Sequence, residues 1–201
     1  MKYQKLGKLP IETIDFFLTE ILKRKKTNYS YQWIQFDEYL NTEFLKIFTN
    51  TELKIQWSED RTNPIQKAFY SDPGHGMRIH KDGVQCQSAL NITLSCNPTD
   101  WVRWYDESYI NSITPTLIAD RWGKSRNTNL FRYDSIPFVE ELRNEVGDVY
   151  ALDVDTYHSF KCVGSNPRIV LQTKFEGFPS FEKIRESLTK NSFSNLIPRL
   201  V

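Results

Sequence analysis

Apolar residues recur at helical spacing in two segments near the start of the chain. Residues 11–26 and 37–48 each carry an apolar side chain every three or four positions, and Asp37 stands where a helix cap is expected. The residues concerned are Ile14, Phe17, Leu18, Ile21 and Leu22, then Tyr39, Leu40, Phe44, Leu45 and Phe48. We expect both helices to lie against one face of a sheet. A third helix is predicted after Ser180, with Phe181, Ile184 and Leu188 on one side.

The run from residue 88 to residue 95 alternates apolar and polar side chains with a period of two, as a half-buried strand does. One face of this strand would carry Leu90, Ile92 and Leu94, and the other Asn91 and Thr93. Short apolar runs at 53–57, 66–70, 149–154 and 168–175 predict further strands, separated by turns rich in glycine, proline and asparagine, among them Gly74-His75-Gly76.

The remaining segments give weaker patterns. Residues 1–10 fit a mobile start or an edge strand, 112–119 and 128–133 fit strands or loops, and 138–145 fit a helical turn. Short strands with helices at the ends favour a mainly β (α+β) fold, an antiparallel double-stranded β-helix or cupin-like jelly roll. We expect one domain over residues 1–201: helical and strand support in 1–63, the jelly-roll core in 64–176, and a helix and tail in 177–201.

Composition narrows the classes of partner. The 201 residues include 26 basic and 25 acidic side chains, so the net charge of +1 predicts no strong field for nucleic acid or a membrane. The run Lys23-Arg24-Lys25-Lys26 fits either a nucleic-acid patch or, better, the solvated last turn of the first helix. No stretch has the apolar length of a membrane span and no signal-peptide core follows the first residues, so we expect a soluble, cytoplasmic protein.

The candidate chemistry lies in a His-x-Asp pair. On an extended segment His80 and Asp82 project to the same side, and His158 is a suitable third ligand. Two imidazoles and one carboxylate form a facial triad that leaves open positions on a ferrous ion. The same three residues also suit a catalytic zinc. The His-x-Asp pair taken alone favours the other interpretation of His80, a surface or core histidine.

The order His-x-Asp, distal His and then Arg168 resembles the Fe(II)/2-oxoglutarate-dependent dioxygenase superfamily, and more narrowly its prolyl-hydroxylase-like branch. Tyr70, the Gly74–Gly76 turn and His80-Lys81-Asp82 follow one another as in that branch. Gly147-Asp148-Val149-Tyr150-Ala151-Leu152-Asp153 before His158 is similar to the family's Gly-Asp strand. The resemblance covers residues 64–176, is specific in the two motif regions, and is poor between 101 and 146.

The resemblance implies a metal site of His80, Asp82 and His158, with Fe(II), 2-oxoglutarate and O2 as cofactors. Arg168 would bind the far carboxylate of 2-oxoglutarate, for which a bidentate, permanently charged partner is suited; a surface ion pair is its alternative role. Tyr70 would help hold the co-substrate or pack in the core, and Asn91 would touch it if its face lines the barrel. Asp82 favours hydroxylation with release of succinate and CO2, because halogenating relatives lack that carboxylate. Val170 departs from the family, where a Ser or Thr often assists the arginine.

Several alternatives remain open from the sequence. A zinc enzyme with the same triad and a non-catalytic jelly-roll binding module both fit the residues. The substrate would be a small molecule or a protein side chain. An amino-acid or protein side chain is favoured, and nucleic acid is not favoured. Trp101, Trp104 and Tyr105 would line a cleft or pack in the core; His75 would touch substrate or lie in a loop. Three cysteines without paired spacing disfavour disulfides, and Cys162 is a buried thiol in preference to a ligand.

Overall fold

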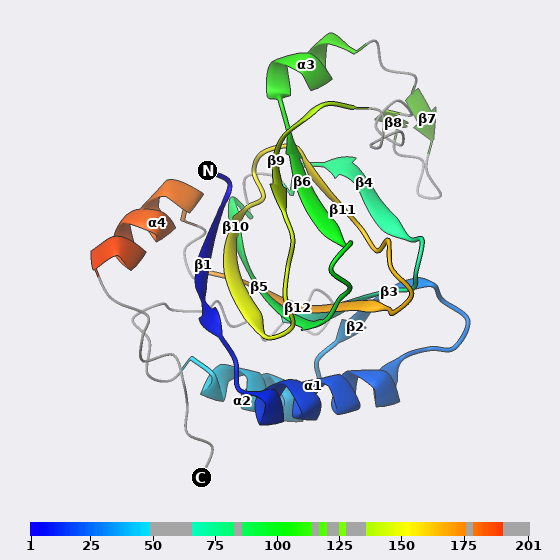
Figure 1. Cartoon of the computed structure of the whole chain (residues 1–201), viewed down its shortest axis with the longest axis vertical. Helices are drawn as coiled ribbons and strands as arrows, with labels where there is room; N and C mark the ends of the chain where they lie inside the picture. Colours follow the sequence, from blue (N-terminus) through cyan, green and yellow to red (C-terminus); the bar gives the residue numbers. More distant parts are fainter. Residues whose placement is uncertain are drawn as a thin grey trace.

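Two antiparallel sheets stacked face to face form the body of the protein (Figure 1). The computed structural model describes residues 1–48, 66–82, 86–113, 117–119, 125–127, 136–175 and 179–190. The larger sheet has the strand order β1 (Tyr3–Lys8), β10 (Asp148–Asp153), β5 (Ser88–Ser95), β12 (Arg168–Lys174), β3 (Lys67–Ser71) and β2 (Tyr31–Gln35). The smaller sheet has the order β4 (Gly76–His80), β11 (His158–Lys161), β6 (Trp101–Tyr105) and β9 (Phe138–Leu142).

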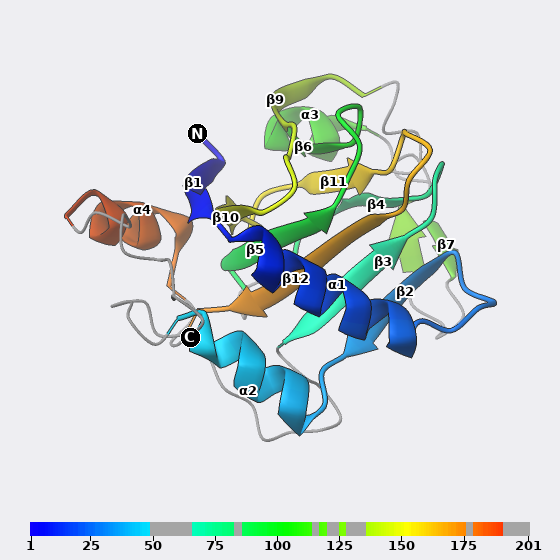
Figure 2. The same cartoon turned by 60° about the horizontal axis from the view of Figure 1, so that its bottom comes forward.

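Four helices and a small hairpin complete the described elements. The helices are α1 (Ile11–Arg24), α2 (Glu38–Lys46), α3 (Glu107–Ser112) and α4 (Phe181–Lys190), and the hairpin pairs β7 (Leu117–Ala119) with β8 (Ser125–Asn127). The helices α1 and α2 run across the outer side of the larger sheet, as Figure 2 shows from below, while α4 lies beside β1 and β10. No helix in the described ranges has both the length and the apolar character that crossing a bilayer would require.

The apolar stripes of α1 and α2 bury themselves against the larger sheet. Phe17 and Ile21 of α1 and Phe44 of α2 are at most 1% exposed and belong to the main hydrophobic cluster. The Asp37 side chain accepts a hydrogen bond of 2.8 Å from the backbone N–H of Leu40, which caps α2 as the sequence predicts. Packing of these stripes fixes which face of each strand points outward.

Strand alternation then assigns the inner face of the larger sheet. Leu90, Ile92 and Leu94 of β5 and Ile169 and Leu171 of β12 belong to the cluster under the helices. The side chains between them therefore point to the inner face, toward the smaller sheet. These inner residues include Asn91 and Thr93 on β5 and Arg168, Val170 and Gln172 on β12.

The mainly β, jelly-roll fold is confirmed, as are the first two helices, the edge strand β1 and the helix after Ser180. Two expectations were wrong. Residues 138–142 form the strand β9 in place of a helical turn, because they pair with β6. The strand at 88–95 is buried on both faces, since the second sheet covers the inner side. The predictions at 53–57 and 128–133 lie outside the described residues. The sequence patterns missed β2, β6, β8 and α3.

Candidate metal centre

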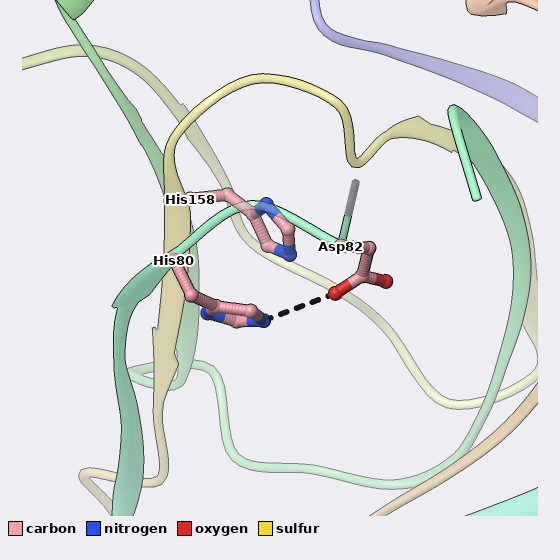
Figure 3. Close-up of side chains that lie close together, drawn as sticks. All are labelled: His80, Asp82 and His158. Atoms are coloured by element: carbon pink, nitrogen blue, oxygen red, sulfur yellow. Dashed lines mark ion pairs between the residues drawn. The ribbon is translucent and has the colours of Figure 1, made fainter. Parts of the chain in front are cut away.

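Three potential metal ligands meet at one end of the smaller sheet. His80 ends β4 and His158 begins β11, and the two residues are a directly opposed antiparallel pair. Asp82 follows His80 by two residues, and its backbone N–H donates to the carbonyl of Val154 at 3.0 Å. One ligand atom from each of the three side chains lies within 4.8 Å of the other two (Figure 3).

The ring orientation of both histidines is set by the backbone. The Nδ1 atom of His80 lies 2.8 Å from the carbonyl oxygen of Arg78, and that of His158 lies 2.9 Å from the carbonyl oxygen of Thr156. Each Nδ1–H can donate to the carbonyl two residues earlier, which leaves Nε2 pointing inward as the ligand atom. His80 Nε2 is 3.3 Å from Asp82 Oδ1.

Electrostatics keep His158 neutral and Asp82 ionised near neutral pH. Burial, aided by the neighbouring His80, lowers the pKa of His158 from 6.5 to about 4. Burial alone would raise the pKa of Asp82, but its interactions with His80, His158 and Lys67 outweigh burial, so the pKa lies below its usual 3.8. Metal ligation needs these protonation states, a neutral imidazole and a charged carboxylate.

The donor set fits a divalent transition metal. Two imidazole nitrogens and one carboxylate oxygen are the ligands of the facial triad of non-haem iron, and also of catalytic zinc. Ligands about 2.1 Å from a shared ion lie roughly 3 Å apart when they are at right angles, so small side-chain rotations would close the present spacing. Gly76 allows β4 and β11 to approach, because a Cβ there would overlap the carbonyl oxygen of Phe160.

Arg168 is a buried cation without a counter-charge in the described part of the chain. Its side chain is on the inner face of β12, the residue is 4% exposed, and it makes no ion pair or side-chain hydrogen bond with a described residue. Its guanidinium lies 4.7 Å from the ring centroid of Phe160. Burial lowers the pKa of Arg168 against weaker opposing effects from Asp100 and Cys96. A buried charge is costly unless it is paired, so an anion is the expected ligand.

Two residues with hydroxyl groups, which the sequence analysis missed, lie on the strands next to Arg168. Ser71 is directly opposite Arg168 on β3, is fully buried, and its Oγ has no hydrogen-bond partner. Tyr31 is opposite Ser71 on β2, and its ring centroid lies 6.0 Å from that of Phe160 in a tilted arrangement. Burial raises the pKa of its phenol to about 12. The alternation in Tyr31-Gln32-Trp33-Ile34-Gln35 was the available signal for this strand.

Tyr70 lies on the opposite face of the larger sheet from Arg168 and Ser71. It pairs with Ile169 across β3 and β12 and belongs with it to the outer cluster beneath the helices. Its hydroxyl donates to Asp72 Oδ1 at 2.7 Å, and the ammonium group of Lys25 lies 4.1 Å from its ring centroid. Strand alternation therefore gives Tyr70 the core-packing role, the alternative left open by the sequence.

The other candidates fall into two groups. Asn91 does face the barrel interior, is 8% exposed, and its Oδ1 has no hydrogen-bond partner. Cys162 is fully buried and its thiol donates to the carbonyl of Asn166, so it stands outside the triad. His75 is exposed in its turn and also stands outside the triad. The aromatic cluster is core packing, being at most 4% exposed: Trp101, Trp104 and Tyr105.

No protein-family model matches this chain, and no curated protein sequence matches it. Solved structures do match. HygX from Streptomyces hygroscopicus with nickel and 2-oxoglutarate bound gives a TM-score of 0.57 at 10% identity, over 87% of this chain and 82% of that one. An oxidoreductase of the 2OG-Fe(II) oxygenase family from Burkholderia pseudomallei gives 0.55 at 8% identity, over 87% and 84%. The chain thus shares its fold with these two structures.

Proposed function

We propose that this protein is an Fe(II)- and 2-oxoglutarate-dependent oxygenase. One observation carries the proposal: a buried Arg168 that pairs with no described residue, and a triad of His80, Asp82 and His158, lie within the same jelly-roll. The triad alone fits iron or zinc, and the arginine alone fits any anion. A co-substrate with a metal-chelating end and a distant carboxylate accounts for both. The fold of HygX, solved with 2-oxoglutarate bound, supports this interpretation.

The protein's part at the metal is to hold three ligands on one side. His80 and His158 present Nε2 because their Nδ1 atoms face backbone carbonyls, and Asp82 supplies the charged oxygen. When bound, Fe(II) with 2-oxoglutarate and O2 supplies the oxidation of a C–H bond, with release of succinate and CO2. The carboxylate of Asp82 would occupy a ligand position on the metal, and we therefore propose hydroxylation of the substrate.

The far carboxylate of the co-substrate would meet three donors deep in the barrel. Arg168 provides a fixed fork of N–H groups, Ser71 a buried hydroxyl, and Tyr31 a phenol that stays protonated. Val170 cannot donate a hydrogen bond, so the hydroxyl expected from β12 is supplied here by the adjacent strand β3.

The test is ferrous titration of the full chain without oxygen, followed by addition of 2-oxoglutarate. We expect a visible charge-transfer band, and then 2-oxoglutarate-dependent release of succinate once O2 is admitted. His80→Ala and Asp82→Ala should abolish both signals while circular dichroism stays unchanged, and His75→Ala, a matched histidine outside the triad, should retain them. A tightly bound zinc and no response to 2-oxoglutarate would instead identify a zinc enzyme. No metal binding at all would identify a binding module.

The substrate class proposed from the motifs is an amino-acid or protein side chain, within the prolyl-hydroxylase-like branch. The near-neutral charge of the chain supports this choice over nucleic acid. Succinate release measured with free amino acids, with proline-rich peptides and with oligonucleotides would separate the three. Stimulation by oligonucleotides alone would overturn the proposed class.

A further inference from the structure

A second cation that pairs with no residue in the described ranges lies on the inner face of the same sheet. Lys67 is the first residue of β3 and precedes the inner residues Phe69 and Ser71 by two and four positions, so it lies on the same face as they do. Its ammonium lies 4.6 Å from the ring centroid of Trp33 and 5.3 Å from that of Phe69. It makes no ion pair or side-chain hydrogen bond with a described residue. Burial lowers the pKa of Lys67, so holding this charge inward is unfavourable unless a partner binds.

Amide side chains flank Lys67 on both neighbouring strands. Gln35 of β2 and Gln172 of β12 are its directly opposed partners, and Asn91 of β5 is opposite Gln172. Directly opposed residues share a face of the sheet. We call Gln35, Lys67, Gln172 and Asn91 the polar row. No side-chain hydrogen bond joins Gln172 or Lys67 to a described residue, and the Asn91 Oδ1 is unpaired.

The polar row lies at the metal end of the barrel, apart from Arg168. The charge of Asp82 acts on Lys67, although the two form no ion pair. Arg168 instead opposes Ser71, four residues from Lys67 along β3. Four residues of a strand span about 13 Å. The two cations therefore stand at different depths, and one co-substrate carboxylate at Arg168 leaves Lys67 without an anion.

We propose that Lys67, with the amide of Gln172, binds a carboxylate of the prime substrate and so positions that substrate beside the metal centre. The inference rests on the proposed function, because it presumes that the co-substrate fills the Arg168 end. A single ammonium flanked by neutral amides matches one carboxylate, whereas a phosphate dianion would call for further cations. The rings of Trp33 and Phe69 offer an apolar wall beside the charge for the rest of the molecule.

This assignment favours a substrate that keeps a free carboxylate, such as an amino acid, an acidic side chain or the C-terminus of a peptide. An internal prolyl residue of a longer chain carries no such group. Within the broad substrate class proposed from the motifs, the polar row thus favours members that carry a free carboxylate.

The test measures thermal unfolding of the full chain with Fe(II) and saturating 2-oxoglutarate in the absence of oxygen. The probes are acetate, butyrate and benzoate, each compared with its neutral amide at equal ionic strength set with sodium chloride. Inorganic phosphate is a further arm. The variants are Lys67→Met, which keeps the stem against the two rings but removes the charge, Lys67→Arg, which restores it, and Lys8→Met, a control on an exposed lysine.

We expect each carboxylate, and not its amide, to raise Tm by roughly 3 °C at ten times its Kd in the native chain and in Lys8→Met. Lys67→Met should lose the rise and Lys67→Arg should regain it. An equal rise in Lys67→Met, no carboxylate-specific rise in the native chain, or a response to phosphate alone would each overturn the assignment. Failure of 2-oxoglutarate to bind, with the Lys67-dependent rise retained, would overturn the oxygenase proposal and leave the carboxylate site standing.

Discussion

Replacing Arg168 by methionine should move stability and co-substrate binding in opposite directions. In the free protein the guanidinium is 4% exposed and has no counter-charge among the described residues, so an apolar side chain of similar length removes an unfavourable buried charge. We expect Arg168→Met to be as stable as the native chain or more stable, by about 1–4 kcal/mol, equivalent to roughly 2–4 °C in Tm for each kcal/mol.

The same substitution should weaken 2-oxoglutarate binding strongly. Removing one partner of a buried, hydrogen-bonded charge pair costs about 2–5 kcal/mol, and each 1.4 kcal/mol is a factor of ten. The half-saturating concentration should therefore rise by a factor of about 30 or more, whereas Arg143→Met, at an exposed arginine, should leave it unchanged. The assay is anaerobic titration of the Fe(II) protein, followed by its visible charge-transfer band. A change below about threefold, or a large loss of stability in the free variant, would refute the reasoning.

Three further predictions follow from the structure. Tyr31→Phe should raise the half-saturating 2-oxoglutarate concentration by about 2–10-fold through loss of one hydrogen bond, while Tyr70→Phe should not change it, and equal effects in the same titration would contradict the assigned faces. Burial lowers the pKa of His158 to about 4, against 6.5 in the unfolded chain. The free energy of unfolding of the metal-free protein should therefore be highest above pH 6.5 and fall by about 3 kcal/mol as pH falls toward 4. Urea unfolding of His158→Gln should lack that pH slope. Gly76→Ala should cost about 1–3 kcal/mol and weaken metal binding, because its Cβ would displace Phe160 and separate the two histidines; unchanged metal affinity would contradict this.

The triad could be predicted because its signal is local. His80 and Asp82 are two residues apart, and any extended backbone projects them to one side. Placing His158 opposite His80 needed the fold, which the alternation of the strands and the resemblance supplied together. In the structure, His80 of β4 and His158 of β11 are directly opposed across the two strands.

The co-substrate end could not be predicted in full, because the face of each strand depends on the register of its neighbours. Tyr70 and Ser71 are adjacent, and a shift of one residue exchanges which of them enters the barrel. The outer cluster under α1 and α2 takes Tyr70, so Ser71 faces inward. The helical turn predicted at 138–145 was wrong for a related reason. Pairing with β6, which includes the Arg103–Glu141 ion pair, overrode the local pattern.

The inner face of the larger sheet is itself an argument for function. Val170 is 1% exposed between Arg168 and Gln172, which shows that this face accepts an apolar side chain at an intermediate depth. A barrel selected for stability alone would gain by similar residues at positions 168 and 67, where the chain instead carries cations without partners among the described residues. Arg168 is buried and Lys67 is partly buried, and a bound anion would stabilise each charge further than the neighbouring aromatic rings do. Two such positions on one face, at different depths beside one metal site, are most simply explained by two different anionic ligands.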